Sequence, residues 1–316
     1  MTSVHRDLAA ALLAVDREHA RINVGLAAQL ACLLEVSAPK PGNVSPGRHF
    51  ADLRYEDFLA SALAIGEPMA GAGERGVGAT VRLAVEASQS LTRSNTNLGI
   101  VLLFAPIARA ASSKDTGCDF HTPSRKSHPV SLQDAVRRVL EATTIDDARE
   151  AYVAIRSARP GGLGRAQGQD VSSEPTMTLI EVMRLAAHRD TIASEYATGF
   201  ELTFGTAVPA LERARHDGLP WDAAVVETFL TILAAVADTH IARRSGALLA
   251  ADVTDRARHA LAAGGVRSQK GRQAIDEMDR ALRDERNSGN PGTTADVTAA
   301  AVFVVLLGGG YVSRSA

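Results

Sequence analysis

The sequence is poor in aromatic residues and cysteine, and it carries almost no net charge. Phe, Trp and Tyr make up 4% of its 316 residues, and the formal net charge is -2. The two cysteines, Cys32 and Cys118, form no CxxC or Cys/His spacing, so the sequence gives no signal for a zinc or dithiol site. A near-neutral chain is not attracted as a whole to nucleic acid or to an anionic membrane. Any site for an anionic ligand must therefore be local.

Long hydrophobic runs are also absent. The most apolar run, residues 297–307, has about eleven residues, whereas a membrane-spanning helix needs roughly 20. Residues 1–7 lack the basic region followed by an apolar segment that begins a secretory signal. We therefore predict a cytoplasmic protein with neither a membrane nor a nucleic acid as partner, in which residues 297–307 form a buried core helix.

Helix-forming residues dominate what is present. Hydrophobic residues make up 46% of the chain, and long stretches are rich in Ala, Leu, Arg and Glu, which favour helices. Helical periodicity covers residues 8–36, 55–69, 80–91, 98–111, 132–143, 145–156, 179–204, 221–243, 252–263, 272–284 and 295–307. No convincing strand alternation appears. These patterns predict an all-α fold: one multi-helix bundle that forms a single catalytic domain over residues 1–316, with a surface-loop insertion at 112–129.

The first polar interruption follows the helix predicted over residues 8–36. Glu35 lies in its last turn, and two prolines enclose Lys40 and stop the helix. Gly42 and Asn43 then permit a positive φ, so backbone N–H groups beside the lysine can form an anion nest. One interpretation is a phosphate site; the other is a helix stop with a solvated lysine. A carboxylate at an apolar helix end needs a partner in either case.

The second interruption, residues 94–100, and a polar stretch just downstream of the first each precede an apolar helix. His49 and Asp52 lie before the helix predicted over residues 55–69, where Asp52 can either cap the helix or bind a metal ion. Before the helix over residues 98–111, Asn97 is the expected N-cap, which leaves Asn95 and Thr96 free to contact a ligand. The N-terminus of a helix also binds phosphate through its free N–H groups.

The third interruption is a carboxylate at the end of a nearly apolar run. Residues 229–237 lead into Asp238, His240 and Arg243 without a turn signal. A part-buried carboxylate needs a cation, an arginine or several hydrogen bonds. Asp238 is therefore expected either to contact Mg²⁺, which takes one or two carboxylates in nucleotide sites, or to pair with Arg243 or another arginine.

The fourth interruption opens the final apolar helix. Asn290, Gly292 and Thr293 form a Gly-containing turn that can hold a phosphate at the helix N-terminus. Thr293 followed three residues later by Asp296 also resembles a capping box, with Asp in place of Glu. Four such interruptions exceed what capping alone requires, and they predict a ligand site formed by helix ends and Gly-containing loops.

Together these segments resemble the signature blocks of the triphosphoribosyl-dephospho-CoA synthases. The resemblance rests on four motifs in the same order and at similar spacing: Pro39-Lys-Pro-Gly-Asn-Val44 behind Glu35, Asn95-Thr-Asn-Leu-Gly99, Asp238-Thr-His-Ile-Ala-Arg243 and Asn290-Pro-Gly-Thr-Thr-Ala-Asp296. It implies a pentosyltransferase that moves the triphosphoribosyl group of ATP to the ribose 2′-hydroxyl of dephospho-CoA and releases adenine. The implied product is the prosthetic-group precursor of citrate and malonate decarboxylation enzymes.

The chain departs from the familiar bacterial members of that family. They carry His-Lys where this chain has Asn97-Leu98, and residues 49–58 and 160–164 are more similar to a branch found in archaea and some methylotrophic bacteria. These departures leave a second interpretation open, in which a related nucleotide-dependent glycosyl transfer uses another acceptor in pterin or one-carbon cofactor biosynthesis. A third interpretation is a helical binding protein without catalysis.

The implied chemistry assigns roles to the predicted residues. Displacement of adenine builds positive charge on the ribose, so we expect Glu35 and Asp238 as catalytic carboxylates, one as general base, and Lys40 as the cation that neutralises the triphosphate. Mg²⁺ is the expected cofactor, with Glu35, Asp52 and Asp238 as ligands. The expected nucleotide contacts are Lys40, Gly42, Asn43, His49, Asn95, Thr96, Asn97, Arg243, Asn290, Gly292 and Thr293. ATP and dephospho-CoA, or another small-molecule acceptor, are the expected partners, and a homodimer is the candidate assembly.

Overall fold

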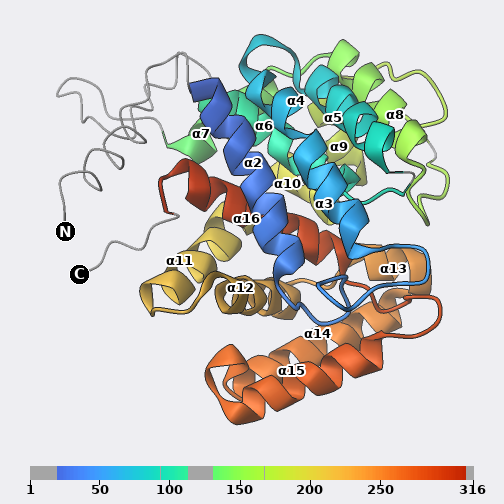
Figure 1. The fold of residues 1–316 in the computed structure, drawn as a ribbon. Coiled ribbons are helices and arrows are strands. Elements are labelled where there is room, and N and C mark those ends of the chain that lie inside the picture. The colour runs from blue at the N-terminus through green and yellow to red at the C-terminus, as the bar shows by residue number, and fades with distance from the viewer. Residues whose placement is uncertain (1–19, 93, 113–130, 167, 311–316) are drawn as a thin grey trace, which may run out of the picture.

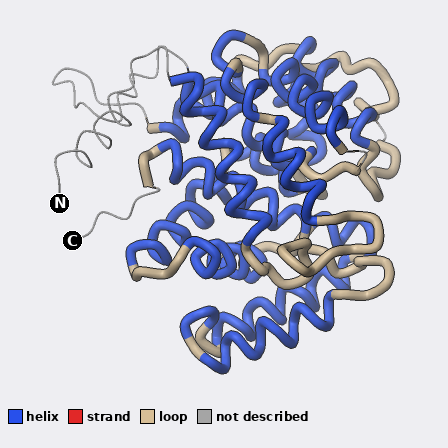
Figure 2. The backbone as a smooth tube through the Cα atoms, viewed as in Figure 1, coloured by secondary structure: helices blue, strands red, loops and turns tan. Residues whose placement is uncertain are grey.

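The regular secondary structure of the described chain is helical throughout. The computed structural model describes residues 20–92, 94–112, 131–166 and 168–310, and Figures 1 and 2 show no strand within these ranges. The α-helices are Ala20–Ser37 (α2), Tyr55–Ala64 (α3), Gly66–Ala70 (α4), Val77–Leu91 (α5), Leu98–Ser112 (α6), Leu132–Glu141 (α7), Ile145–Ala158 (α8), Leu179–Ala186 (α9), Thr191–Thr198 (α10), Val208–His216 (α11), Trp221–Ala235 (α12), Thr239–Ser245 (α13), Ala247–Ala262 (α14), Gln269–Leu282 (α15) and Gly292–Leu307 (α16). Shorter turns are Ala72–Glu74 (η2), Thr203–Ala207 (η4) and Gly265–Arg267 (η5). The all-α prediction is confirmed.

The final helix, α16, lies at the centre of the molecule. It packs side by side with α2, and α6 and α12 also contact it (Figure 1). Both α6 and α16 are apolar on nearly all sides, which is the pattern of a helix surrounded by other helices. Phe104 of α6 stacks on Phe303 of α16 with ring centroids 4.4 Å apart. The prediction that residues 297–307 form a buried core helix is confirmed.

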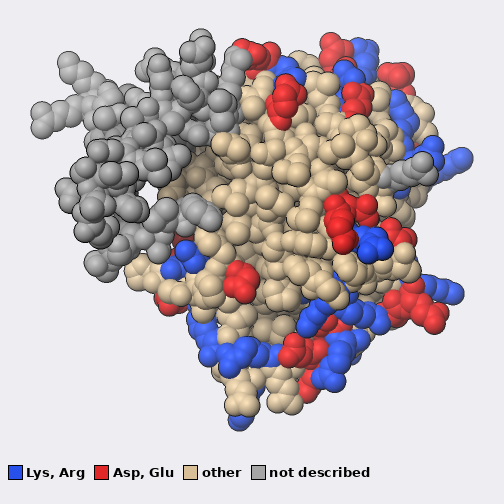
Figure 3. Space-filling view, in the orientation of Figure 1, with Lys and Arg blue, Asp and Glu red and all other residues tan. Residues whose placement is uncertain are grey.

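Charged side chains lie mainly around the rim of the face in view. Figure 3 shows Lys and Arg mixed with Asp and Glu over α14 and α15, whereas the area crossed by α2 is largely uncharged. Among the described helices, none alone is both long and apolar enough to span a membrane. In the described part of the chain, only the consecutive pair α12 and α13 together has the length and apolar composition of a membrane span, and the two helices meet at a bend of 61°.

Three helices predicted as continuous are broken, so those predicted spans are wrong. Residues 55–69 form α3 and α4, residues 179–204 form α9 and α10 and continue into the π-helical η4, and residues 221–243 form α12 and α13. Val236 adopts an extended conformation between α12 and α13, with φ -135° and ψ 131°. Periodicity missed these breaks because apolar residues on both sides of each break face the same core.

A close backbone contact and a proline accompany the break between α3 and α4. A Cβ atom at Gly25 of α2 would lie 2.4 Å from the carbonyl oxygen of Gly66, so the two helices meet where neither carries a side chain. Gly66 opens α4 at this contact and is itself a poor residue for a helix interior. The sequence also carries Pro68, which has no N–H group for the carbonyl oxygen of Ala64 and therefore favours a break at this point; the approach of α2 explains the glycine.

The buried apolar side chains form one continuous cluster. The division of the chain into a single domain over residues 1–316 stays a prediction. Residues 8–19 of the first predicted helix lie outside the described residues, as does the predicted insertion at 112–129 except for Ser112, which ends α6.

Candidate active site

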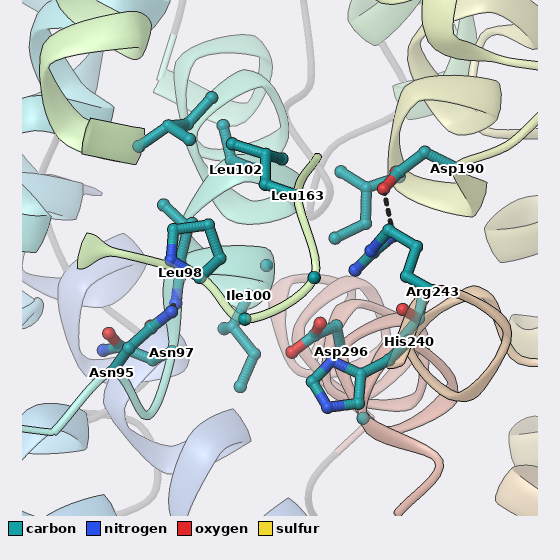
Figure 4. Close-up of a pocket in the computed structure, with 18 of the residues that line it drawn as sticks. Asn95, Asn97, Leu98, Ile100, Leu102, Leu163, Asp190, His240, Arg243 and Asp296 are labelled. Carbon is teal, nitrogen blue, oxygen red and sulfur yellow. Dashed lines mark hydrogen bonds and ion pairs between the residues drawn. The ribbon is translucent and has the colours of Figure 1, made fainter. Parts of the chain in front are cut away.

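Helix ends and a Gly-rich loop enclose a pocket of about 680 Å³. This volume is in the usual range for a small-molecule site. The walls come from the end of α2, the starts of α6, α10 and α16, the end of α13, and the loop over residues 159–170 (Figure 4). Of the predicted site residues, the pocket brings together Glu35, Lys40, Asn43, Asp52, Asn95, Thr96, Asn97, Arg243, Asn290, Gly292 and Thr293. Gly42, His49 and Asp238 are not among the residues that line it.

Glu35 and Lys40 form a buried ion pair at the pocket wall. Their side chains are 5% and 1% exposed, and Lys40 Nζ lies 2.9 Å from Glu35 Oε1. The ammonium also donates to the carbonyl oxygens of Glu35 and Ala38. These contacts satisfy both buried charges, as their burial requires. For Lys40 to bind a phosphate, its ammonium would have to leave Glu35.

Asp279 of α15 accepts hydrogen bonds from the segment that follows Lys40. Gly42 has a φ of 74° and donates its N–H to Asp279 Oδ1 at 2.8 Å, while Arg48 Nη1 donates to Asp279 Oδ2 at 2.9 Å. Arg283 donates to the carbonyl oxygen of Asn43 at 2.5 Å. The N–H of Gly42 is therefore used within the protein, and the segment is held in one conformation beside the pocket.

His49 and Asp52 lie at the surface. His49 is exposed, and its Nδ1 accepts the N–H of Tyr55 at 3.2 Å, at the start of α3. Asp52 is exposed at the edge of the pocket, where its carbonyl oxygen accepts the hydroxyl of Ser94 at 3.4 Å. His49 thus supports the start of α3, and Asp52 lies on the pocket rim.

The asparagines before α6 have different roles in the fold. The amide oxygen of Asn95 accepts the N–H of Leu98 at 3.3 Å, in the first turn of α6. Asn97 is buried and donates from its amide nitrogen to Ser88 Oγ of α5 at 3.0 Å. Asn97 occupies the predicted N-cap position of α6, since its carbonyl oxygen accepts the N–H of Val101, but its side chain packs against α5 instead of bonding the first turn. Thr96 is also buried and donates to a serine hydroxyl of α3.

Asp238 joins the starts of α13 and α16. Its Oδ1 accepts the N–H groups of His240 at 2.8 Å and Ile241 at 3.0 Å, so it is the N-cap of α13. Its Oδ2 accepts both the N–H and the hydroxyl of Thr294, at 2.7 and 2.8 Å. Burial raises the pKa of this carboxyl and the four hydrogen bonds oppose the rise. The alternative that Asp238 pairs with Arg243 is wrong, since Arg243 pairs with Asp190.

Asp296 is the carboxylate that sequence reasoning underrated. The capping-box interpretation is wrong: Pro291 occupies the N-cap of α16 without a side-chain bond, and Asp296 points into the pocket (Figure 4). A Cβ atom at Gly99 would lie 2.0 Å from Asp296 Oδ2, so only glycine leaves room for the carboxylate there. The sequence signal for Asp296 is an acidic residue within an apolar segment, which is the same signal that pointed to Asp238.

The carboxyl of Asp296 has no direct partner. Within the ranges that the structure describes, it has no hydrogen bond or ion pair. Burial raises its pKa well above the usual value, the carboxylates of Glu35 and Asp238 raise it further, and the positive charge of Arg243 opposes the rise. A cation or a proton donor from a bound ligand would stabilise this group, which marks it as a functional candidate.

Two neutral polar groups complete this part of the pocket. Burial, together with the positive charges of Arg243 and Arg244, lowers the pKa of His240 to about 4, so its imidazole is neutral at pH 7. A neutral imidazole offers one donor and one acceptor nitrogen. The buried amide oxygen of Asn290 has no hydrogen-bond partner among the described residues and is available to a donor on a ligand.

The model of one protein family matches nearly the whole chain. Its description is ATP:dephospho-CoA triphosphoribosyl transferase, and the match covers residues 22–315. The chain belongs to this family. A crystal structure from Archaeoglobus fulgidus, assigned by name as a triphosphoribosyl-dephospho-CoA synthase, has a similar fold, with a TM-score of 0.58 and 25% identity over 79% of this chain and 99% of that one.

Curated relatives of this transferase family carry related names. A probable 2-(5''-triphosphoribosyl)-3'-dephosphocoenzyme-A synthase from Pseudomonas aeruginosa strain UCBPP-PA14 is 36% identical over 110 residues, which is 35% of this chain and 37% of the relative. One from Azotobacter vinelandii is 28% identical over 172 residues, or 54% of this chain and 57% of the relative. The chain thus matches little more than a third of the first relative's length. The predicted family is confirmed.

Several carboxylates of this pocket could hold a divalent cation only together with a bound ligand. No three His, Cys, Asp or Glu side chains group as metal ligands within the described residues. Mg²⁺ in nucleotide sites needs only one or two protein carboxylates, because phosphates and water supply the rest. Glu35 and Asp52 of the predicted ligands line the pocket, and Asp296 adds an unpaired carboxylate. The oxygens of Asp238 are already occupied by four donors.

The four hydrogen bonds of Asp238 yield a prediction for stability. Asp238→Ala removes a helix cap and leaves buried N–H groups of α13 and α16 without an acceptor, so the free energy of unfolding should fall by at least about 2 kcal/mol. Urea unfolding measures this loss. Asp222→Ala, at an exposed carboxylate in the first turn of α12, is the control and should change little. Equal unfolding midpoints for the two variants would contradict the structural role.

Proposed function

We propose that the protein transfers the triphosphoribosyl group of ATP to the ribose 2′-hydroxyl of dephospho-CoA and releases adenine. The observation that carries the proposal is the unpaired carboxylate of Asp296 in a pocket lined by residues of all four family motifs. The names of the relatives support the same reaction. As a biosynthetic transferase of small molecules, the protein is expected to work in the cytoplasm.

The chain's own residues account for the charges that this reaction develops. The bond from the ribose anomeric carbon to adenine breaks, the bond to the acceptor oxygen forms, and the ribose gains positive charge between the two events. Carboxylates that are fixed beside the ribose stabilise this charge. Glu35 is held for this role by Lys40, and Asp296 projects from α16 into the same pocket.

Asp296 is the proposed base for the acceptor hydroxyl. Its raised pKa brings the carboxyl closer to the working pH, which favours proton exchange. The proton leaves the acceptor hydroxyl for Asp296, and adenine takes up a proton as it departs, so the overall proton count is unchanged. Asp238, which the sequence had suggested as a catalytic group, is assigned here to positioning α13 and α16.

The proposed metal is Mg²⁺, held by Glu35 or Asp52, since Asp296 is assigned to the acceptor proton. When bound, it would neutralise part of the triphosphate charge. Lys40 remains a predicted phosphate contact that competes with its pairing to Glu35. Asn43, Asn95 and the amide oxygen of Asn290 are the proposed polar contacts to ribose and base.

The decisive test is adenine release by the purified protein from ATP and Mg²⁺, with and without dephospho-CoA. We expect release that depends on dephospho-CoA, together with a product whose mass has increased by the triphosphoribosyl group. Release that is independent of dephospho-CoA would indicate hydrolysis or another acceptor and reject the proposed acceptor. A protein that binds no nucleotide would instead favour the helical binding protein.

A further inference from the structure

Three separate segments bring arginines to one end of the pocket. Arg159 follows α8, Arg189 precedes α10, and Arg243 and Arg244 lie in the last turn of α13; all four line the pocket. Contacts between the segments show that they converge. A Cβ atom at Gly162 would lie 3.2 Å from the carbonyl oxygen of Arg243, and one at Gly161 would lie 3.9 Å from Arg244 Cδ.

Arg189 lies close to α13 because the following residue, Asp190, pairs with Arg243. Asp190 forms an ion pair with Arg243, drawn as a dashed line in Figure 4, and also caps α10. Arg189 is the next residue along the backbone and is exposed. Arg159 is also exposed, while Arg244 contacts His240 Nε2 at 3.4 Å and the carbonyl oxygen of Arg286 at 3.3 Å.

This end of the pocket therefore has a surplus of positive charge. The four arginines outnumber the two carboxylates that interact with Arg243, namely Asp190 in an ion pair and Asp296 through its electrostatic field. The contrast with Lys40 is clear, because its ammonium is fully engaged by Glu35 and two carbonyl oxygens. Guanidinium groups suit phosphate oxygens, since their planar N–H groups bind two oxygens at once and always carry charge.

We propose that Arg159, Arg189, Arg243 and Arg244 bind the polyphosphate chain of a nucleotide substrate. The identity of that substrate rests on the proposed function. The arginines, rather than Lys40, are then the main phosphate contacts. In Figure 4, Asp296 appears between the Arg243–Asp190 pair and the asparagines before α6. A polyphosphate at the arginine end thus leaves the ribose within the part of the pocket that holds Asp296.

Two substrates carry such a chain: the triphosphate of ATP and the diphosphate of dephospho-CoA. The test uses Arg159→Gln combined with Arg189→Gln, because both side chains are exposed and their loss should not disturb the core. Arg213→Gln is the matched control, an exposed arginine on α11 that does not line the pocket. Calorimetric titrations with ATP, inorganic tripolyphosphate, dephospho-CoA and adenosine measure the affinities.

We expect the double variant to bind tripolyphosphate and at least one of the two nucleotides roughly tenfold or more weakly, with adenosine affinity unchanged. The loss should shrink at high salt, since screening weakens exposed ionic contacts. Weaker ATP binding assigns the cluster to the triphosphate, and weaker dephospho-CoA binding assigns it to the diphosphate. Unchanged affinities for all phosphate ligands, or an equal loss in the Arg213→Gln control, would overturn the proposal.

Failure of this inference can be distinguished from failure of the proposed function. Binding is read directly, without turnover. If the wild-type protein releases adenine in the presence of dephospho-CoA while the double variant binds and reacts normally, only the arginine site is refuted. If binding of tripolyphosphate depends on the arginines but no adenine is released with dephospho-CoA, the polyphosphate site stands and the proposed reaction is rejected.

Discussion

Asp296→Asn is expected to lower dephospho-CoA-dependent adenine release by about 10² to 10⁴-fold while the protein becomes more stable. The loss follows from removal of the proposed general base, whose usual contribution is of that size. The gain in stability follows because the substitution removes a negative charge that lies close to Glu35 and Asp238 and has no partner among the described residues. Such opposite effects on activity and stability are typical of functional sites.

The stability gain of Asp296→Asn should depend on pH in a defined direction. The pKa of Asp296 is raised in the folded protein, so between the usual aspartate value and the raised value the folded state binds more protons than the unfolded state. Stability therefore falls as pH rises through this window. The variant lacks this loss, so its advantage should be greatest above the window and disappear below it.

Thermal unfolding over a pH series, together with adenine release at one pH, measures both effects. Asp252→Asn on α14 is the control, because that carboxylate is exposed and paired with Arg256. Wild-type activity in the Asp296→Asn variant would remove Asp296 from the reaction. If the stability of the Asp296→Asn variant depended on pH as that of the wild type does, the pKa of Asp296 would not be raised in the folded protein.

Lys40→Met should reduce the free energy of unfolding by about 3–5 kcal/mol, because it leaves Glu35 buried without its cation. The two side chains are 1% and 5% exposed, so water cannot replace the lost partner. Adding Glu35→Gln removes the uncompensated charge and should restore most of the stability. Urea unfolding of the wild type, both single variants and the double variant gives the coupling free energy between the two residues.

The double variant also tests the predicted phosphate role of Lys40. If Lys40 is mainly the partner of Glu35, the folded Glu35→Gln, Lys40→Met protein should bind ATP with an affinity close to that of the Glu35→Gln single variant. A large further loss of ATP affinity in the double variant would make Lys40 a direct phosphate contact. Additive losses of stability in the single variants would contradict the pairing itself.

Most of the residues that the sequence predicted for the site line the pocket, because the signals for them are local. The segment around Lys40, the Asn-rich start of α6 and the Gly-containing start of α16 each interrupt an apolar stretch, and each contributes residues to the pocket wall. The use of individual groups was misjudged, since it depends on neighbours distant in the chain. Asp238 is satisfied by Thr294, 56 residues away, whereas Asp296 has no partner among the described residues.

By itself, the sequence determined that this chain is all-α, that residues 297–307 are a core helix, and that it belongs to its family. Helix propensity, 3.6-residue periodicity and glycine or proline interruptions are properties of neighbouring residues, so they can be read along the chain. Only the tertiary structure decided which carboxylate faces the pocket, how Asp238 is bonded, and that Arg159, Arg189 and Arg243 line one pocket. These outcomes depend on contacts between α2, α6, α10, α13 and α16, because burial and charge are balanced in space across helices rather than along any one of them.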